Sequence, residues 1–208
     1  MSVVSGACSS IGRAADLYPV AARHAPDKGL VVGSNPSRRI QRRMAPRIFN
    51  IEIPAGRIAI TAAPRGIDDL TDQIAPLRKL GVHVMVSLLT DPECAELGVA
   101  AEGSVYESVG IGFLRFPIAD HDVPGDRRQF RQFVSEIVAR LKKGSFILIH
   151  CRAGIGRSSL VAACVMGAIG IDPATAFRQI TLARGCSVPD TTEQLSWTRQ
   201  FVAWLQAQ

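Results

Sequence analysis

The sequence lacks an uncharged apolar run long enough to cross a membrane. The longest such stretch, residues 158–171, falls short of the ~20 residues that a membrane-spanning helix requires. The chain also does not start with a basic segment followed by an apolar one, so no secretory signal is expected. These absences predict a cytoplasmic protein without a transmembrane segment.

Cysteine pairs of the kinds that build disulfide scaffolds or zinc sites are also missing. The five cysteines are an odd number, are widely scattered, and form neither a C-x-x-C pair nor a His/Cys cluster with metal-ligand spacing. We therefore expect no metal site. A reducing compartment, in which a thiol stays free, fits this cysteine usage.

Acidic residues are scarce in the first 47 residues, which hold eight Lys and Arg but only two acids. Residues 48–208 hold sixteen of each, so the net charge of +6 belongs to the first segment and the body is formally neutral. Because residues 1–47 show no apolar periodicity, we expect a basic, disordered extension there. Its arginine cluster at residues 38–43 could contact anionic lipid or nucleic acid, and its composition loosely resembles a transit peptide. A solvated leader is the simplest interpretation. The neutral body is not expected to bind nucleic acid.

The remaining chain is long enough for one domain, and 47% hydrophobic against 20% charged residues predicts a buried core. Runs of β-branched and apolar residues predict strands over residues 57–61, 82–89, 112–116 and 145–149. Apolar periodicity and capping residues predict helices over residues 70–80, 126–143, 158–170, 173–184 and around 197–205, with a polar helical stretch after residue 89. This alternation predicts an α/β fold: a single compact domain, residues 48–208, with a central mixed sheet flanked by helices.

Two of these helices carry apolar stripes. In the first helix Leu80 continues the stripe that begins at Leu70, and Pro76 predicts a kink or a late start. Aromatic residues of the last helix form a second stripe, which we interpret as core packing rather than a ligand site. Its members are Trp197, Phe201, Trp204 and Leu205.

The most informative segment, residues 150–159 (HCRAGIGRSS), lies where a strand ends and a buried helix begins. Backbone N–H groups of a glycine-containing loop and the dipole of the following helix bind anions at such a junction. Cys151, placed at the helix N-terminus, is expected to ionise to a nucleophilic thiolate. Six positions later Arg157 is expected to grip two phosphoryl oxygens, and Ser158 to donate its hydroxyl group to the thiolate.

Residues 150–158 resemble the complete signature H-C-x5-R-[ST] of the cysteine-dependent protein tyrosine phosphatases, and AGIGRS is the common form of that loop. The resemblance implies a phosphocysteine intermediate at Cys151 that water then hydrolyses, without a metal or organic cofactor. It also implies substrate contacts from the loop residues Arg152, Ala153, Gly154, Ile155, Gly156 and Arg157.

Residues 116–124 (FPIADHDVP) lie where that family has its mobile acid loop, and the P-x-x-D…P form is similar to dual-specificity and lipid-phosphatase members. The resemblance makes Asp120 the general acid that protonates the leaving oxygen, which is typically worth about 10²- to 10⁴-fold. Asp122 is the reserve candidate. The alternative is that both are solvated loop carboxylates.

Departures from the family pattern indicate a subfamily. The acid loop lacks the tryptophan of a W-P-D loop, no Asn-Arg-Tyr-type segment lies upstream, and the body is short, which together are typical of the dual-specificity-like branch. Phosphoinositide-directed members often carry two lysines in the loop, where this chain has Arg152 and Ile155. We therefore expect a phosphorylated protein as substrate, with a phosphoinositide as the alternative; the sequence does not indicate an oligomeric state.

Two other functions compete with this interpretation. Gly154-x-Gly156-x-x-Ser159 imitates a dinucleotide fingerprint, but the third glycine is missing and only about fifty residues follow. The other is a phosphatase fold that binds phosphate without turnover. Such a protein would be expected to lack the cysteine, the arginine or the acid, whereas Cys151, Arg157 and Asp120 are all present. Other residues are interpreted as supporting ones: His150 orients the loop, Cys164 packs in the core, and Gln194 either positions the hydrolytic water or is a surface glutamine.

Overall fold

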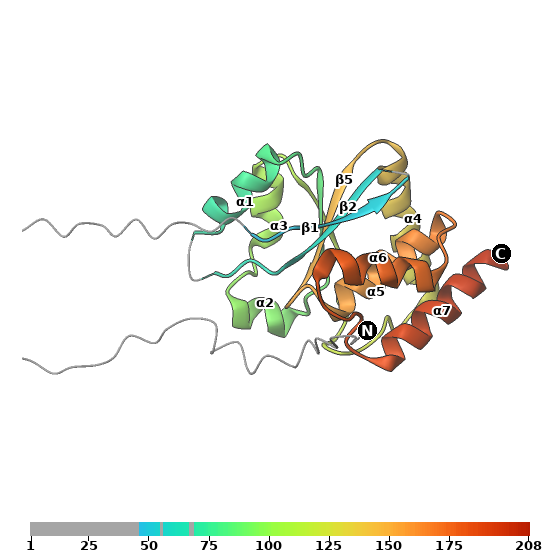
Figure 1. Cartoon of the computed structure of the whole chain (residues 1–208). Helices are drawn as coiled ribbons and strands as arrows, with labels where there is room; N and C mark the ends of the chain where they lie inside the picture. The colour runs from blue at the N-terminus through green and yellow to red at the C-terminus, as the bar shows by residue number, and fades with distance from the viewer. Residues whose placement is uncertain (1–45, 55, 67–68) are drawn as a thin grey trace, which may run out of the picture. The chain divides into compact units, whose positions relative to one another are not determined.

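The computed structural model describes residues 46–54, 56–66 and 69–208. Its centre is a five-stranded sheet in the order β1-β2-β5-β3-β4 (Figure 1). The strands are β1 (Phe49–Ile53), β2 (Gly56–Ala62), β3 (Val84–Ser87), β4 (Gly112–Arg115) and β5 (Phe146–Cys151). Only the β1–β2 pair is antiparallel, so the sheet is mixed, as the sequence predicts.

Seven helices in the described residues cover the sheet on two sides (Figure 1). They are α1 (Leu70–Lys79), α2 (Asp91–Leu97), α3 (Glu102–Ser108), α4 (Arg127–Lys142), α5 (Gly156–Ala168), α6 (Pro173–Arg184) and α7 (Thr192–Gln206). Helices α1 and α3 pack on one face of the sheet, and α4 to α7 pack on the other. The predicted α/β architecture with one sheet between helical layers is therefore confirmed.

The apolar strands follow from this layering. In β5, Ile147 and Ile149 face the core under α4 to α7, whereas Phe146 and Leu148 face the core under α1. A parallel strand covered on both faces buries every side chain, so its sequence is continuously apolar and does not alternate. The sequence FILI reflects that position.

The predicted elements agree with the structure except at particular points. The strand β1 was not expected, because FNIEI carries two polar residues at an edge of the sheet. Strand β5 runs two residues further than predicted, through His150 and Cys151. Leu80 does not continue the apolar stripe of α1, because it is the C-terminal cap of that helix and is 50% exposed. The extension predicted over residues 1–47 lies outside the described residues as far as residue 45.

The aromatic stripe of α7 divides into two parts. Trp197 and Phe201 stack on each other and meet Phe130 of α4 edge-on, with ring centroids 5.0 to 5.2 Å apart. These two residues pack in the core, as predicted. Trp204 also packs against this core, with its ring centroid 5.9 Å from that of Phe201, but the guanidinium groups of two arginines of α4 lie over its ring as well.

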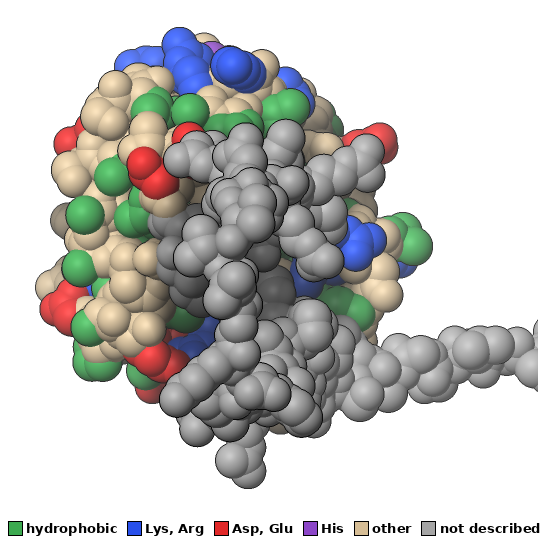
Figure 2. All heavy atoms as spheres, turned by 90° about the vertical axis from the view of Figure 1, so that its left-hand side faces the viewer, with side chains coloured by type: hydrophobic (Ala, Val, Ile, Leu, Met, Phe, Trp, Pro, Cys, Tyr) green, Lys and Arg blue, Asp and Glu red, His purple; other side chains and the backbone are tan. Residues whose placement is uncertain are grey.

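Charge is unevenly spread over the surface. On the face shown in Figure 2, Lys and Arg side chains gather most densely along the upper edge, and Asp and Glu side chains are scattered over the rest. Among the described residues, no helix combines the length and the apolar character that crossing a membrane requires.

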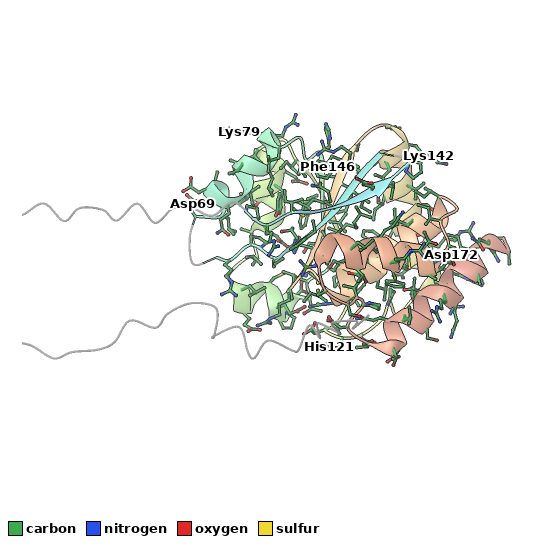
Figure 3. All side chains as sticks on the ribbon, viewed as in Figure 1. Asp69, Lys79, His121, Lys142, Phe146 and Asp172 are labelled. Atoms are coloured by element: carbon green, nitrogen blue, oxygen red, sulfur yellow. The ribbon has the colours of Figure 1, made fainter. Side chains whose placement is uncertain are left out.

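The parallel strands direct the site to one end of the sheet. Figure 3 places Phe146, where β5 begins, toward the upper end and His121 at the lower end. Strand β5 therefore delivers Cys151 at its carboxyl end, close to the loops that follow β3 and β4. Ligands of parallel α/β sheets bind at this end of the strands.

Candidate active site

The loop between β5 and α5 surrounds the sulfur of Cys151. The amide of Gly154 donates a hydrogen bond to Cys151 Sγ over 3.3 Å, and Ser158 Oγ lies 3.5 Å from the same sulfur. The cysteine is 3% exposed and Ser158 is fully buried. The predicted nucleophile and its predicted hydroxyl partner are thus in contact, at the N-terminus of a buried helix.

Glycine is required at one position of this loop. Gly154 has φ +67°, and a Cβ atom there would lie 2.5 Å from the carbonyl oxygen of Thr61 in β2. A side chain would therefore push the loop off the sheet. The close approach keeps the loop packed against β2 while its amide points at the sulfur.

Arg157 is almost completely buried, with a side chain 1% exposed. Its Nη1 and Nη2 atoms donate to the two carboxylate oxygens of Glu93, each over 2.8 Å, and Nη1 also donates to the carbonyl oxygen of Ile118. A guanidinium has five N–H donors in one plane. These three bonds hold that plane in place and leave the edge formed by Nη2 and Nε for a further ligand.

The pKa values of this buried pair favour the charged forms. Burial by itself raises the pKa of Glu93, but hydrogen bonds from Arg157 and Thr90 outweigh burial and bring the pKa down to about 2. Burial likewise lowers the pKa of Arg157, and the hydrogen bonds to Glu93 and the neighbouring acidic groups raise it above its ordinary value. The guanidinium therefore stays cationic at the bottom of the site.

The predicted acid lies on the remaining edge of the arginine. Asp120 Oδ1 is 2.8 Å from Arg157 Nη2, and its other oxygen is 3.7 Å from His121 Nε2. His121 has φ +60°, a conformation that non-glycine residues rarely adopt. The reserve candidate Asp122 instead accepts the amide of Val123 through Oδ1. The geometry thus favours Asp120 over Asp122 as the acid that faces the loop.

The side chain of Arg152 does not face the phosphate loop. Both of its terminal nitrogens are bonded to Glu96 of α2, and the hydrogen bond from Nη1 is 2.7 Å long. Of the predicted substrate-binding residues, Ala153 is exposed, Gly154 and Gly156 are buried, and Ile155 is partly buried. Arg152 is therefore left with only its backbone available to a phosphate in that loop.

A third group approaches the loop from the segment before α7. A Cβ atom on Gly156 would collide with Asp190 Oδ2 and lie 2.9 Å from Gln194 Oε1, so both side chains lie against the loop. Burial raises the pKa of Asp190, His121 opposes this rise, and Asp120 adds to it. A carboxyl group that holds its proton more strongly than usual thus borders the site.

Gln194 is not a surface residue. It is fully buried in the first turn of α7, and its Nε2 atom donates to the carbonyl oxygen of Asp122 over 3.1 Å. Its Oε1 atom has no hydrogen-bond partner in the described part of the chain. The surface interpretation is therefore wrong, and Gln194 connects α7 to the acid loop.

His150, predicted to orient the loop, has buried polar partners that sequence reasoning missed. His150 is fully buried, and its Nε2 atom is 3.2 Å from Glu102 Oε2. The other oxygen of Glu102 accepts a 2.6 Å hydrogen bond from Ser87 Oγ at the end of β3. His150 thus lies under the loop in a position consistent with orienting it.

Sequence reasoning also missed Glu93 and Asp190. A local signal for Glu93 exists, because Thr90-x-x-Glu93 forms a capping box at the start of α2. Glu93 accepts from the amide of Thr90 over 3.0 Å, and this bond holds the carboxylate where Arg157 reaches it. No local signal marks Asp190, whose contact with the loop exists only after folding.

The sequence of this chain is similar to those of known phosphatases. Residues 59–170, just over half of the chain, match the family described as "Polymorphic toxin system, DSP-PTPase phosphatase". Human cyclin-dependent kinase inhibitor 3 is 30% identical over 127 residues, which cover 60% of this chain and 59% of that protein. A putative tyrosine phosphatase (067L) of invertebrate iridescent virus 3 is 34% identical over 98 residues, 46% of this chain and 38% of that protein. The chain thus matches less than two thirds of the length of these relatives.

Solved structures share the fold. A kinase associated phosphatase with its catalytic site cysteine replaced by serine superimposes with a TM-score of 0.70 at 23% identity, covering 80% of this chain and 99% of that one. PTPMT1 in complex with PI(5)P gives a TM-score of 0.62 at 18% identity, over 76% and 97% of the two chains. At these identities the likeness establishes the fold alone.

Proposed function

This chain belongs to the DSP-PTPase phosphatase family, and from that membership we propose that it hydrolyses phosphomonoesters through a phosphocysteine intermediate at Cys151. The observation that supports the proposal most strongly is that the loop of the cysteine meets a carboxylate from a distant segment. Arg157, six positions after Cys151 in that loop, lies 2.8 Å from Asp120 through Nη2, and the sulfur of Cys151 accepts the amide of Gly154 in the same loop. Nucleophilic catalysis of phosphoryl transfer needs these three kinds of group.

In the first step the thiolate of Cys151 attacks phosphorus. A sulfur–phosphorus bond forms, the bond from phosphorus to the alcohol oxygen breaks, and Asp120 gives its proton to that leaving oxygen. Arg157 and the loop amides neutralise charge on the other phosphoryl oxygens. Because Asp120 faces the same guanidinium edge, a bound phosphoryl group displaces this carboxylate from Arg157 Nη2. Away from the cation the carboxylate takes up a proton from solvent, and this is the proton that it gives to the leaving oxygen.

In the second step water replaces sulfur. Asp120, now ionised, takes a proton from water, the new oxygen–phosphorus bond forms, and the phosphorus–sulfur bond breaks to release inorganic phosphate. The departing thiolate is stabilised by the amide of Gly154 and the hydroxyl group of Ser158. The residues of the chain supply each role, so the proposed reaction needs no metal ion. The proposal includes a reducing compartment, since the thiol must stay unoxidised.

We further propose a phosphorylated protein as the substrate. With Arg152 bonded to Glu96, the loop presents no second cationic side chain of its own to a polyphosphorylated headgroup. A single buried arginine suits one phosphoryl group. The phosphoinositide complex of the related fold keeps a lipid substrate as the alternative.

The test is hydrolysis of para-nitrophenyl phosphate in the presence of a chelator, followed by a panel of phosphopeptides and phosphoinositides. We expect turnover of the aryl phosphate and of phosphopeptides, inhibition by vanadate, and no effect of the chelator. Turnover of phosphoinositides alone would contradict the substrate class. The absence of any phosphatase activity would contradict the proposed function.

A further inference from the structure

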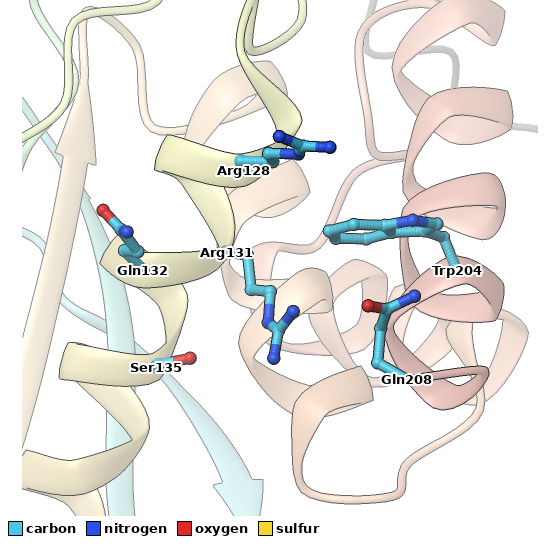
Figure 4. A pocket seen from close by; sticks show the side chains of 6 residues that line it. All are labelled: Arg128, Arg131, Gln132, Ser135, Trp204 and Gln208. Atoms are coloured by element: carbon cyan, nitrogen blue, oxygen red, sulfur yellow. The ribbon is translucent and has the colours of Figure 1, made fainter.

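A groove of about 800 Å³ lies between α4 and the C-terminal end of α7, outside the candidate active site (Figure 4). Arg128 and Arg131 of α4 line one side, and Trp204 of α7 lines the other (Figure 4). Its remaining lining residues are Gln132, Ser135 and Gln208. The groove is therefore cationic and polar, with one large aromatic surface and no acidic side chain among its lining residues.

The arginines beside this groove have no acidic partners within the described part of the chain. The guanidinium carbons of Arg127 and Arg131 each lie 5.9 Å from the centroid of the Trp204 ring, and no carboxylate is paired with Arg127, Arg128 or Arg131. Some surface arginines elsewhere do have such partners. Arg140, at the other end of the same helix, is bonded to Glu136 over 2.6 Å.

Folding does not account for this concentration of charge. The first turn of a helix favours anions and disfavours cations, yet α4 begins with arginines and has no acid in its first turn. The free N–H groups at the start of α4 do not form an anion site here, because Asp126 already accepts hydrogen bonds from the N–H groups of Arg128 and Gln129. Arg127 and Arg128 thus present positive charge where it slightly destabilises the helix.

We propose that this groove docks an acidic segment of the phosphoprotein substrate, an inference that depends on the proposed function. Guanidinium groups bind carboxylates in a bidentate way, and the Trp204 ring offers an apolar surface to the side chains between them. The chain's own first 47 residues carry a net charge of +6 and would be repelled from the groove. The hollow between two helices fits a peptide better than the surface of a membrane.

The groove is within reach of the active site. Helix α4 starts directly after the acid loop, and Gln194 of α7 donates a hydrogen bond to that loop at Asp122. Eight positions separate Asp120 from Arg128, and a chain of that length spans at most about 28 Å. A substrate that places its phosphoryl group at the active site therefore needs at most about eight extended residues to bring acidic side chains to the groove.

The experiment compares two phosphopeptides that share one phosphorylated core. One carries four glutamates centred about eight residues from the phosphorylated residue, and the other carries glutamines there. The double variant Arg128→Gln/Arg131→Gln is matched with Lys142→Gln/Lys143→Gln, which removes the same charge from the other end of α4. Para-nitrophenyl phosphate, too small to reach the groove, reports on the active site alone.

We expect the unaltered protein to favour the acidic peptide by roughly three- to tenfold in kcat/KM at low salt, since each exposed ion pair is worth about 0.2 to 1 kcal/mol. The preference should shrink as salt is raised. The groove variant should lose it and keep its activity on para-nitrophenyl phosphate, whereas the lysine variant should retain it. Equal rates on both peptides, or equal loss in both variants, would overturn the proposal.

A binding measurement separates this proposal from the proposed function. An unphosphorylated peptide with the same glutamates should bind the unaltered protein and should not bind the groove variant. Calorimetry and tryptophan fluorescence measure this binding. This result is expected even if no substrate is hydrolysed, in which case only the proposed function fails. Binding of anionic vesicles that needs Arg128 and Arg131, without peptide binding, would assign the groove to a membrane and overturn the proposal.

Discussion

The two walls of the candidate active site differ in how they are held. The loop wall, residues 150–158, is packed between the sheet and α5, and the Arg157 side chain is 1% exposed. The acid loop, residues 116–124, is open to solvent at its tip, where the side chains of Asp120 and His121 are 50% and 66% exposed. Its ties to the rest of the molecule include the carbonyl contacts of Ile118 with Arg157 and of Asp122 with Gln194.

This difference matches the two tasks of the chemistry. A group that binds charge in the transition state works best when the fold holds it rigidly before substrate arrives. A group that must leave Arg157 and then reach the leaving oxygen needs a segment with few buried contacts. We therefore expect substitutions in the loop wall to affect both activity and stability, and those in the acid loop to affect activity alone.

The largest effect is expected at the centre of the loop wall. Cys151→Ser replaces a thiolate by a hydroxyl group that stays protonated, so kcat should fall by at least about 10⁴-fold. The measurement is turnover of para-nitrophenyl phosphate. Cys164→Ala is the control, because burial raises the pKa of the Cys164 thiol and leaves it unreactive. Retained turnover in Cys151→Ser would contradict the role of the sulfur.

A change in the acid loop should lower turnover without loosening the fold. Asp120→Asn removes the transferable proton, so kcat for alkyl and aryl phosphates should fall by about 10²- to 10⁴-fold while KM changes little. The loss of activity at high pH, which reports deprotonation of the acid, should disappear from the pH profile. Asp122→Asn is the matched control. An equal loss in both variants, or a loss confined to KM, would contradict the assignment to Asp120.

Glu93 tests whether the loop wall depends on a partner from α2. Glu93→Gln removes the more deeply buried of the two carboxylates that face Arg157, and the free energy of unfolding at pH 7 should fall by about 3 kcal/mol. Because the pKa of Glu93 is lowered from 4.5 to about 2, this stabilisation is present above pH 4.5 and is lost as the pH falls toward 2.

Chemical denaturation at pH 7 and pH 3 measures this effect. The difference between the unaltered protein and Glu93→Gln should shrink at the lower pH. Glu96→Gln, which removes the partner of the more exposed Arg152, is the control and should destabilise the protein much less than Glu93→Gln. A Glu93→Gln difference that is independent of pH would contradict the ion-pair explanation.

Asp190 is expected to give the smallest effect. Burial raises its pKa, so the folded protein disfavours the ionised form, and the corresponding stability is lost as the pH rises through the pKa of the folded state. At pH 7 the carboxylate borders the loop that binds a phosphate dianion. Asp190→Asn should therefore lower KM by about two- to threefold, with Glu193→Gln as the control. A raised KM would instead show that this carboxylate helps to hold the loop.

The loop wall could be predicted from the sequence because its chemistry is local. The residues from His150 to Ser158 form one continuous run, and the strand and helix that carry them are marked by continuous apolar sequence. Partners from elsewhere could not be predicted in the same way. Glu93 lies 64 residues before Arg157, and its local pattern explains only a helix cap. The direction of Arg152 toward Glu96 likewise depends on how α2 packs.

The aromatic stripe of α7 likewise shows what the sequence alone could not predict. Spacing alone assigns Trp197 and Trp204 to one apolar face, since they are seven residues apart on a helix. In the structure both pack against the core, but their neighbours differ: Phe130 meets Trp197 edge-on, whereas Trp204 also has two arginines of α4 over its ring. Periodicity gives the face of a helix but not what lies opposite to it.

Direct detection of phosphate on Cys151 is the most decisive measurement. The Asp120→Asn protein should form the intermediate from para-nitrophenyl phosphate, a substrate with a good leaving group, and hydrolyse it slowly. Mass spectrometry of the rapidly quenched protein should then find a phosphoryl group on the peptide that contains Cys151. Turnover without any phosphorylated protein, or phosphate on another residue, would contradict the account.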